Sequence, residues 1–405
     1  MKLPERIAGE HVLGVAVLIA TPLSVVSPVA LTGIVVAAGL AGLALLWRDG
    51  HLERLRRPPV ASLAVAALAL LLAWGALSAL WAVQPHDVAT LVPSLIALLA
   101  AGLMLQAATS GLDAAALTRL AFLLRLGFLL GFLLVAIEVE TDYAITRALH
   151  QWQHGTRVIS FGALDRAMAL LVLIGFPLGI SYARQERMVL ALGALLPALV
   201  LSGFVNSQSV RIAAGAGLVV FMMVWFIGPW AIRVFGAVIV VLALVMPALP
   251  LGPLAPAVWE TALRGVKYSA LQRLYIWEFA ANRVLDHPWI GWGLNASRSI
   301  PGGDAPAPGG GVLLALHPHN GLLQVWLELG AVGAALTAVV IGLLFAGAAR
   351  IADRYERAAV AGQLIAGLVI LCLSFGVWQT WWLAALALAA VVSLAWARGQ
   401  IPQRT

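Results

Sequence analysis

Charged residues are scarce in this chain. Only 11% of its 405 residues are Asp, Glu, Lys or Arg, whereas about a quarter of a typical soluble domain is charged. This scarcity excludes a water-soluble globular protein. Glycine and proline are scattered without a period, which excludes fibrous and low-complexity chains. Apolar residues are abundant instead, at 62% of the chain with a mean hydropathy of +0.97, so the composition predicts an integral membrane protein.

Cysteine is also nearly absent. Cys372 is the single cysteine of the chain, and it lies in the apolar run 368–373. An intrachain disulfide and a cysteine metal cluster are therefore both excluded.

Apolar runs, separated by charged residues or by Pro and Gly, predict about twelve membrane-spanning helices. These runs cover residues 11–28, 30–47, 60–82, 88–108, 117–137, 162–182, 188–205, 210–227, 231–249, 321–349, 359–377 and 380–397. The predicted fold is an all-α polytopic membrane protein with three parts. They are nine helices over 1–249, a long loop with amphipathic helices over 250–320, and three helices with a tail over 321–405.

The distribution of basic residues predicts the orientation. If the N-terminus is cytoplasmic, the inside loops carry most of the Lys and Arg, including clusters at 48–57 and 350–357. The first sizeable outside loop, 81–87, carries none. Because Lys and Arg concentrate in cytoplasmic loops, we expect both termini in the cytoplasm and residues 250–320 on the opposite side.

Nine basic residues oppose this bias and need another explanation. They are Arg147, Arg157, Arg166, Arg211, Arg264, Lys267, Arg273, Arg283 and Arg298. One interpretation pairs them with the eight acidic residues of the same region. The other is an extracytoplasmic pocket for a polyanion, because guanidinium groups match phosphate oxygens in two-pronged hydrogen bonds. Both interpretations stay open on the sequence alone.

The segment 250–320 is the only long stretch that does not span. Residues 256–285 have helical spacing with basic residues interleaved, which is typical of a helix at a membrane surface. Arg273 and Trp277 are four residues apart and therefore share one helix face. The Gly- and Pro-rich residues 301–311 form either a mobile lid or a simple connector.

Two histidines lie just before the tenth predicted span. Pro318 disfavours a helix at His317, and Asn320 is a good N-cap for the span that follows. His317 and His319 are then idle interfacial residues, a metal pair with His287 or Asp304, or candidates for a general base. Histidine suits the last role because its pKa lies near neutral pH.

A second span also begins on the outer side with candidate ligands. Its first residues, Ser209-Val-Arg211, present free backbone N–H groups and a positive helix dipole, both of which attract anions. Arg166, beside Asp165, is the most deeply embedded cation on that side, and Arg157 precedes it in the same region. Charges within a membrane are by default candidates for function.

Taken in order, these residues resemble the O-antigen ligase and polymerase superfamily, most closely the WaaL-type O-antigen ligases of Gram-negative bacteria. The resemblance rests on four motifs between about 205 and 330: Ser209-Val-Arg211, Arg273-x-x-x-Trp277, His287-Pro with Gly291-Trp-Gly293, and the string from His319-Asn320 to Glu328-x-Gly330. It also covers the twelve-span architecture.

The resemblance implies a glycosyltransferase of the GT-C-like membrane class, in the bacterial inner membrane with its site on the periplasmic face. Such ligases move O-antigen from undecaprenyl diphosphate to a sugar hydroxyl of lipid A–core, without metal, cofactor or nucleic acid. The implied catalytic residues are His319 or else His317. The implied substrate-binding residues are Arg211, Arg273, Arg166, Arg157 and Asn320.

Three alternatives compete with a ligase. An O-antigen polymerase uses the same donor with a second carrier-linked glycan as acceptor. A metal-dependent glycosyltransferase would use Glu138, Glu140 and Asp142 as ligands. A transporter of lipid-linked glycan fits twelve spans, but the candidate polar groups gather at one face and not at the midplane where transporters bind.

Overall fold

The computed structural model describes residues 7–55, 62–156, 164–205, 207–263, 268–308 and 310–397. Regular structure in this part of the chain is helical, apart from one isolated bridge between Pro306 and Val312. The predicted all-α class is therefore confirmed. Its α-helices are α1 (Gly9–Val26), α2 (Ala30–Arg48), α3 (Ser62–Leu77), α4 (Pro85–Ala108), α5 (Ala114–Glu140), α6 (Ala144–His154), α7 (Asp165–Ala183), α8 (Met188–Gly193), α9 (Leu196–Leu201), α10 (Gln208–Ile227), α11 (Pro229–Val245), α12 (Pro256–Leu263), α13 (Tyr268–Asp286), α14 (Gly321–Ala348), α15 (Arg354–Leu373) and α16 (Thr380–Ala397).

Ten helices of the described part are long and apolar enough to cross a membrane. They match ten of the twelve predicted spans, and α16 is a shorter apolar helix at the place of the last one. The predicted span 188–205 is interrupted, because α8 and α9 are two six-residue helices. Pro197 lies in the first turn of α9, where its missing N–H is tolerated. A proline there favours the start of a new helix over continuation of α8.

The helix α7 forms the centre of the bundle. Almost all of its residues are buried, and it contacts α1, α5, α8, α9, α10, α15 and α16. Beside it, α10 and α15 approach closely through Gly217 and Gly362, since a Cβ on Gly217 would lie 2.8 Å from the carbonyl oxygen of Gly362. Small residues of this kind allow transmembrane helices to pack at short range. The close pairing brings the start of α10 beside the end of α15.

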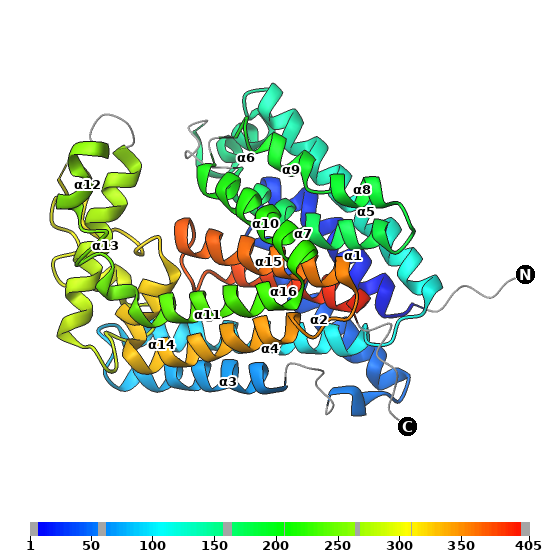
Figure 1. The fold of residues 1–405 in the computed structure, drawn as a ribbon, viewed down its shortest axis with the longest axis horizontal. Coiled ribbons are helices and arrows are strands. Elements are labelled where there is room, and N and C mark those ends of the chain that lie inside the picture. The colour runs from blue at the N-terminus through cyan, green and yellow to red at the C-terminus, as the bar shows by residue number, and fades with distance from the viewer. Residues whose placement is uncertain are drawn as a thin grey trace, which may run out of the picture.

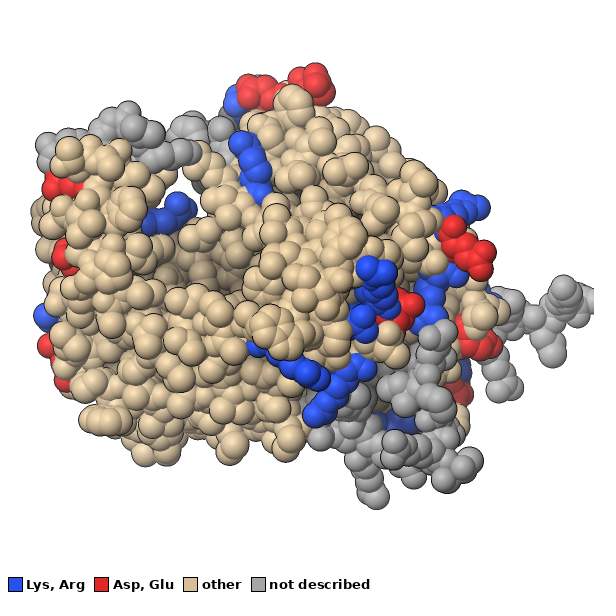
Figure 2. All heavy atoms as spheres, in the orientation of Figure 1, with Lys and Arg blue, Asp and Glu red and all other residues tan. Residues whose placement is uncertain are grey.

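Figure 2 shows charged side chains at the end with α12 and α13, along the top of the view and over the opposite half of the molecule. At one end, Arg119 contacts Glu10 at 2.8 Å, and Arg54 donates to the carbonyl of Ser110 at 3.3 Å. At the other end lie α12, α13 and the segment that leads to α14 (Figure 1). Which end faces the cytoplasm stays a prediction.

Residues 250–320 stand out from the bundle at one end, where α12 and α13 are drawn in yellow-green (Figure 1). The single amphipathic helix expected over 256–285 is two helices, α12 and α13. Residues 264–267, with Arg264 and Lys267, lie outside the described residues. The helix α13 packs against α14, and this contact brings Arg273 toward the two histidines.

Candidate functional site

The turn that carries the two histidines is held at both sides. Asn320 is the N-cap of α14, and its Oδ1 accepts the backbone N–H of Leu323 at 3.2 Å, as predicted from the sequence. The side-chain amide of Asn320 also donates to the sulfur of Met246 at 3.4 Å. From α13, the indole of Trp277 donates to the carbonyl of Pro318 at 2.8 Å. Asn320 therefore orders the turn through its side-chain oxygen and one amide N–H, and its predicted role in substrate binding stays a prediction.

Hydrogen bonds assign a different tautomer to each histidine. Nδ1 of His319 lies 2.8 Å from the carbonyl oxygen of Ser374, which can only accept, so this nitrogen carries the hydrogen. Nδ1 of His317 accepts the backbone N–H of His319 at 3.1 Å, so it carries none. When both rings are neutral, His319 therefore keeps a free lone pair on Nε2, whereas His317 presents an N–H there.

Burial keeps both rings neutral. It lowers the pKa of His317 to about 3, with further lowering from the charges of His319 and Arg298. Burial also lowers the pKa of His319, and the positive charge of Arg273 adds to that effect, while the hydrogen bond to Ser374 opposes it. The neutral imidazole is the form that accepts a proton. The rings lie 4.3 Å apart between their centroids, so they form one site.

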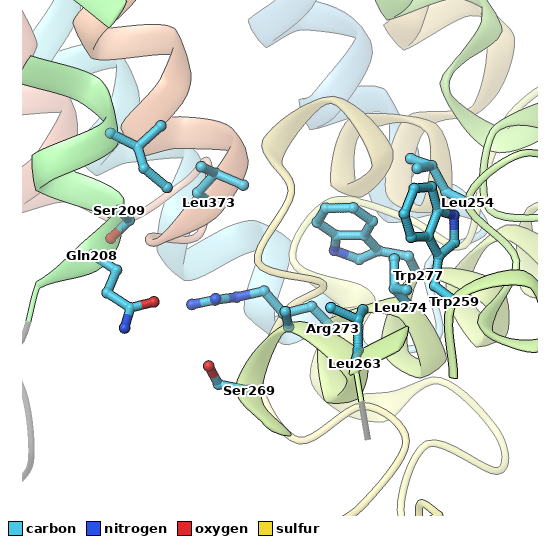
Figure 3. A pocket seen from close by; sticks show the side chains of 12 residues that line it. Gln208, Ser209, Leu254, Trp259, Leu263, Ser269, Arg273, Leu274, Trp277 and Leu373 are labelled. Carbon is cyan, nitrogen blue, oxygen red and sulfur yellow. The ribbon is translucent and has the colours of Figure 1, made fainter. Parts of the chain in front are cut away.

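A cavity of about 450 Å³ lies where α10, α12, α13 and the end of α15 meet. Figure 3 shows the side chain of Arg273 extending into it from α13, toward Gln208 and Ser209 at the start of α10. Leu274 and Trp277 line the α13 side. In Figure 2 the same region of the molecule is hollowed, between the arm of α12 and α13 and the body of the bundle. The cavity combines a mostly apolar wall with a guanidinium group.

Arg273 is the cation best placed to meet a ligand in this cavity. Its side chain is half-buried, and desolvation lowers its pKa, although a guanidinium remains charged at any physiological pH. No carboxylate in the described part of the chain pairs with it. A partly dry guanidinium without a counter-charge is a binding site for an anion.

Arg211 lies beside this cavity but does not line it. Its Nη2 donates to the carbonyls of Ser202 at 2.8 Å and Gly203 at 3.2 Å, and its side chain is exposed. Gln208 and Ser209 from the preceding residues of α10 line the cavity instead. The structure therefore brings the entrance of α10 to the site, as the sequence suggests, while the Arg211 guanidinium points to the loop before it.

The other predicted binding arginines do not line the cavity in the described part of the chain. Arg166 is exposed and lies over the ring of Trp381 at 5.7 Å. Arg157 lies outside the described residues. Among the outer bases that the structure describes, Arg147 contacts Asp142 at 2.9 Å and Arg283 contacts Asp286 at 3.1 Å. For these two residues the pairing interpretation holds.

A buried carboxylate braces the region behind the histidines. Glu328 of α14 is fully buried and accepts five hydrogen bonds. Its donors are the backbone N–H of Asn295, the N–H and hydroxyl of Ser297, the amide of Gln324 and the indole of Trp378. A buried carboxylate is tolerated when its oxygens are satisfied in this way. Glu328 therefore joins α14 to two segments remote from it in sequence.

Two glycines let separate backbone segments approach each other closely beside Glu328. Gly291 and Gly330 have φ of +68° and +63°. A Cβ on Gly291 would lie 2.4 Å from the backbone of Glu328, and one on Gly330 would lie 2.3 Å from the backbone of Trp289. Only glycine fits such positions without a clash. The motifs Gly291-Trp-Gly293 and Glu328-x-Gly330 thus have a shared structural role.

The hydrogen-bond network around Glu328 extends to the backbone that holds His319. The side-chain oxygen of Gln324 accepts the N–H of Val377 at 2.9 Å while its amide donates to Glu328. Val377 belongs to the turn that also contains Ser374, whose carbonyl fixes His319. Sequence analysis assigned no role to Gln324, Glu328 or Ser374. The one available signal was a charged residue within an apolar run.

The metal-binding alternatives gain no support from the arrangement. Within the described ranges, no group of three or more His, Cys, Asp or Glu side chains could hold an ion. The ring of His287 packs against Trp292, with centroids 4.4 Å apart. Glu138 accepts the N–H groups of Ile145 and Thr146 at 2.8 and 3.0 Å, which caps the start of α6 and gives this acid a structural role.

Comparison with known proteins finds a family match in the part of the chain that contains the two histidines. Residues 198–338 match the family model described as O-antigen ligase. Among curated proteins, the chain is 26% identical over 275 residues to a protein of Rickettsia conorii and 27% identical over 270 residues to one of Rickettsia felis. Both are named provisionally as polysaccharide ligases. The matches cover 64% of this chain and 62% and 63% of those proteins.

A relative from Rickettsia prowazekii, with the same provisional name, is more similar over a shorter stretch. It is 38% identical over 119 residues, which is 28% of this chain and 29% of that protein. The chain therefore matches less than two thirds of the length of the first two relatives. The family match includes the entrance of α10, all of α13, the two histidines and Glu328, whereas Ser374, Val377 and Trp378 lie beyond it.

Proposed function

We propose that this chain, a member of the O-antigen ligase family by its match over residues 198–338, transfers a polysaccharide from undecaprenyl diphosphate to a sugar hydroxyl of lipid A–core. The single observation that best supports this function is the hydrogen bond from Nδ1 of His319 to the Ser374 carbonyl at 2.8 Å. It leaves Nε2 free to accept a proton, and the neighbouring Arg273 extends its guanidinium into an open cavity.

Arg273 binds the diphosphate of the donor in this proposal. Charge-assisted hydrogen bonds to phosphate are about twice as strong as neutral ones, and they strengthen as charge develops on the leaving diphosphate. Leu254, Trp259 and Leu274 line the same cavity, which suits the polyprenyl chain. Arg211 joins Arg273 when its guanidinium turns from the Ser202 carbonyl to the phosphate, while Arg166 and Arg157 add positive charge nearby.

The transfer itself needs one base. The acceptor hydroxyl gives its proton to Nε2 of His319 as its oxygen attacks the anomeric carbon of the donor sugar. The bond from that carbon to the diphosphate breaks, and its electron pair leaves with the diphosphate, so the configuration inverts. The N–H on Nε2 of His317 offers a hydrogen bond to the reacting sugars. Diphosphate is already a good leaving group, so no metal is required.

The same proposal assigns the cavity to the periplasmic face of the inner membrane, with both termini cytoplasmic. Cysteine labelling tests this topology in a Cys372→Ala background. A reporter at exposed Pro308 should react with an impermeant maleimide in intact spheroplasts, whereas a reporter at exposed Arg233 should react only after lysis. The opposite pattern would reverse the orientation and rule out a periplasmic site.

Reconstituted transfer is the direct test of function. Purified protein in vesicles receives undecaprenyl-diphosphate-linked glycan together with lipid A–core, and the product is followed as a gel shift. We expect transfer to lipid A–core that persists after treatment with EDTA. Extension of the carrier-linked glycan without any lipid A–core product would identify a polymerase instead.

A further inference from the structure

A second cavity lies at the opposite end of the bundle from the histidines. It has a volume of about 560 Å³. The helix α7 carries Arg166 at its first turn and Tyr182 near its end, which separates the two by about 24 Å at 1.5 Å per residue. Arg166 lies on the side of the proposed site and Tyr182 lines the second cavity. This cavity therefore belongs to a different depth of the membrane.

The cavity is an apolar groove between α5, α7 and the pair α8 and α9. Its lining residues are Phe122, Arg125, Leu126, Phe128, Leu129, Phe132, Leu178, Tyr182, Val189, Leu190, Gly193, Ala194 and Pro197. Several of these side chains are exposed on the flank of the bundle, among them Phe122, Leu129 and Val189. The interruption between α8 and α9 contributes Gly193, Ala194 and Pro197, which are small or lack a long side chain. The broken span thus leaves room for another apolar group.

One end of this groove carries a fixed positive charge. The guanidinium of Arg125 lies over the ring of Tyr182 at 4.1 Å and donates to the Ser181 carbonyl at 2.8 Å and to Gln185 at 2.9 Å. Its Nε donates to the Ser181 hydroxyl at 3.3 Å. These contacts use three of the five N–H groups of an arginine, and two remain. No carboxylate lines the groove in the described part of the chain.

We propose that this groove binds one anionic glycerophospholipid, with its phosphate on Arg125 and an acyl chain along α5. Arg125 and Phe132 are seven residues apart, so the groove extends over about 10 Å of helix, which accommodates part of an acyl chain. Lipid tails are as apolar as these side chains, so the chain alone gives little preference over bulk bilayer. Headgroup charge supplies the selectivity, because Arg125, with Arg187 at the N-cap of α8, makes this end positive.

Filling the groove tests the proposal without removing the charge. A Cβ added to Gly193 meets no atom within 4 Å, so Gly193→Phe places a ring in the groove. A Cβ on exposed Gly33 of α2 meets none either, and Gly33→Phe is the matched control. Native mass spectrometry of delipidated protein, titrated with dioleoyl phosphatidylglycerol or dioleoyl phosphatidylcholine, counts the tightly bound lipids.

The wild type and Gly33→Phe should bind one phosphatidylglycerol tightly and phosphatidylcholine about tenfold more weakly, which corresponds to about 1.4 kcal/mol. Gly193→Phe should lose this molecule. Arg125→Gln should bind both lipids equally, whereas Arg233→Gln, which removes an exposed charge from α11 away from the groove, should keep the preference. Equal binding by Gly193→Phe and Gly33→Phe would overturn the proposal, as would equal affinity of the wild type for both lipids. Glycan transfer is not the readout, so these outcomes are independent of the proposed function.

Discussion

Two adjoining regions of this protein differ in how their polar groups are satisfied. Around Glu328, the carboxylate accepts five hydrogen bonds from donors of the same chain, and four of these five bonds are buried. Around Arg273, the guanidinium extends into an open cavity and meets no carboxylate of the described residues. A satisfied network stabilises a conformation, whereas an unsatisfied charge is available to a ligand. We call these two regions the Glu328 clamp and the Arg273 cavity.

His319 lies at the boundary between the two regions. The turn at Ser374, which the clamp holds through Gln324, fixes its Nδ1. On its other side, the charge of Arg273 lowers its pKa. Changes in the cavity should therefore weaken binding and leave folding intact, whereas changes in the clamp should weaken both folding and the alignment of His319.

The largest effect is expected at His319. His319→Ala removes the proposed base and should lower transfer by about 10²- to 10⁴-fold, while binding of the carrier lipid persists. His317→Ala should be milder, because Nδ1 of His317 is already occupied by a backbone N–H. Transfer to lipid A–core and carrier binding are measured in parallel for both variants. If His317→Ala were inactive while His319→Ala stayed active, His317 and not His319 would be the base.

The next largest effect is expected in the cavity. Arg273→Ala should lower transfer by about 10- to 100-fold, since a charge-assisted contact contributes roughly 1.5–3 kcal/mol, and Arg211→Ala should follow it. Lys at either position should restore only part of the activity, because it lacks the two-pronged geometry. Thermal melting should be little changed by Arg273→Ala. Transfer at the wild-type rate by Arg273→Ala would show that the diphosphate does not bind in this cavity.

A smaller effect on both folding and transfer is expected in the clamp. Gln324→Leu leaves the Val377 N–H and one Glu328 contact unsatisfied, which should cost about 1–3 kcal/mol of stability. Gln363→Leu is the matched control, because Gln363 is a buried glutamine bonded to Leu173 and Ser393 away from the histidines. Both variants should melt earlier. Only Gln324→Leu should lower transfer per folded molecule. Equal transfer per folded molecule by the two variants would show that the clamp stabilises the fold without aligning His319.

The last effect is a pH dependence of stability from His317, which is absent near neutral pH and develops only in acid. Its pKa is about 3 in the folded protein and about 6.5 in an unfolded chain. Between these values only the unfolded state takes up the proton, so stability falls as pH falls from 6.5 toward 3, by about 1.4 kcal/mol per pH unit. His317→Asn keeps an acceptor for the His319 N–H and should flatten this part of the melting-temperature profile. An unchanged profile would show that other groups cause the acid sensitivity.

The sequence by itself determined the features that depend on local pattern. Apolar runs located the spans because length and hydropathy are properties of a continuous segment. Asn320 followed from local capping rules, and the shared face of Arg273 and Trp277 followed from helical spacing. The break near Pro197 was missed because the apolar run continues through it.

The tertiary structure alone decided how these features act together. The tautomer of His319 depends on a carbonyl 55 residues away, and the Glu328 clamp joins residues 31 to 50 positions apart. The residue pattern of a single helix does not predict hydrogen-bond partners on segments remote in sequence. The sequence also left the direction of the Arg211 side chain undetermined. Its guanidinium donates to the carbonyl of Ser202, and only the packing of the end of α9 beside α10 brings that carbonyl within reach. Local periodicity thus specifies the helices, while the packing of remote segments assigns the protons and charges of the site.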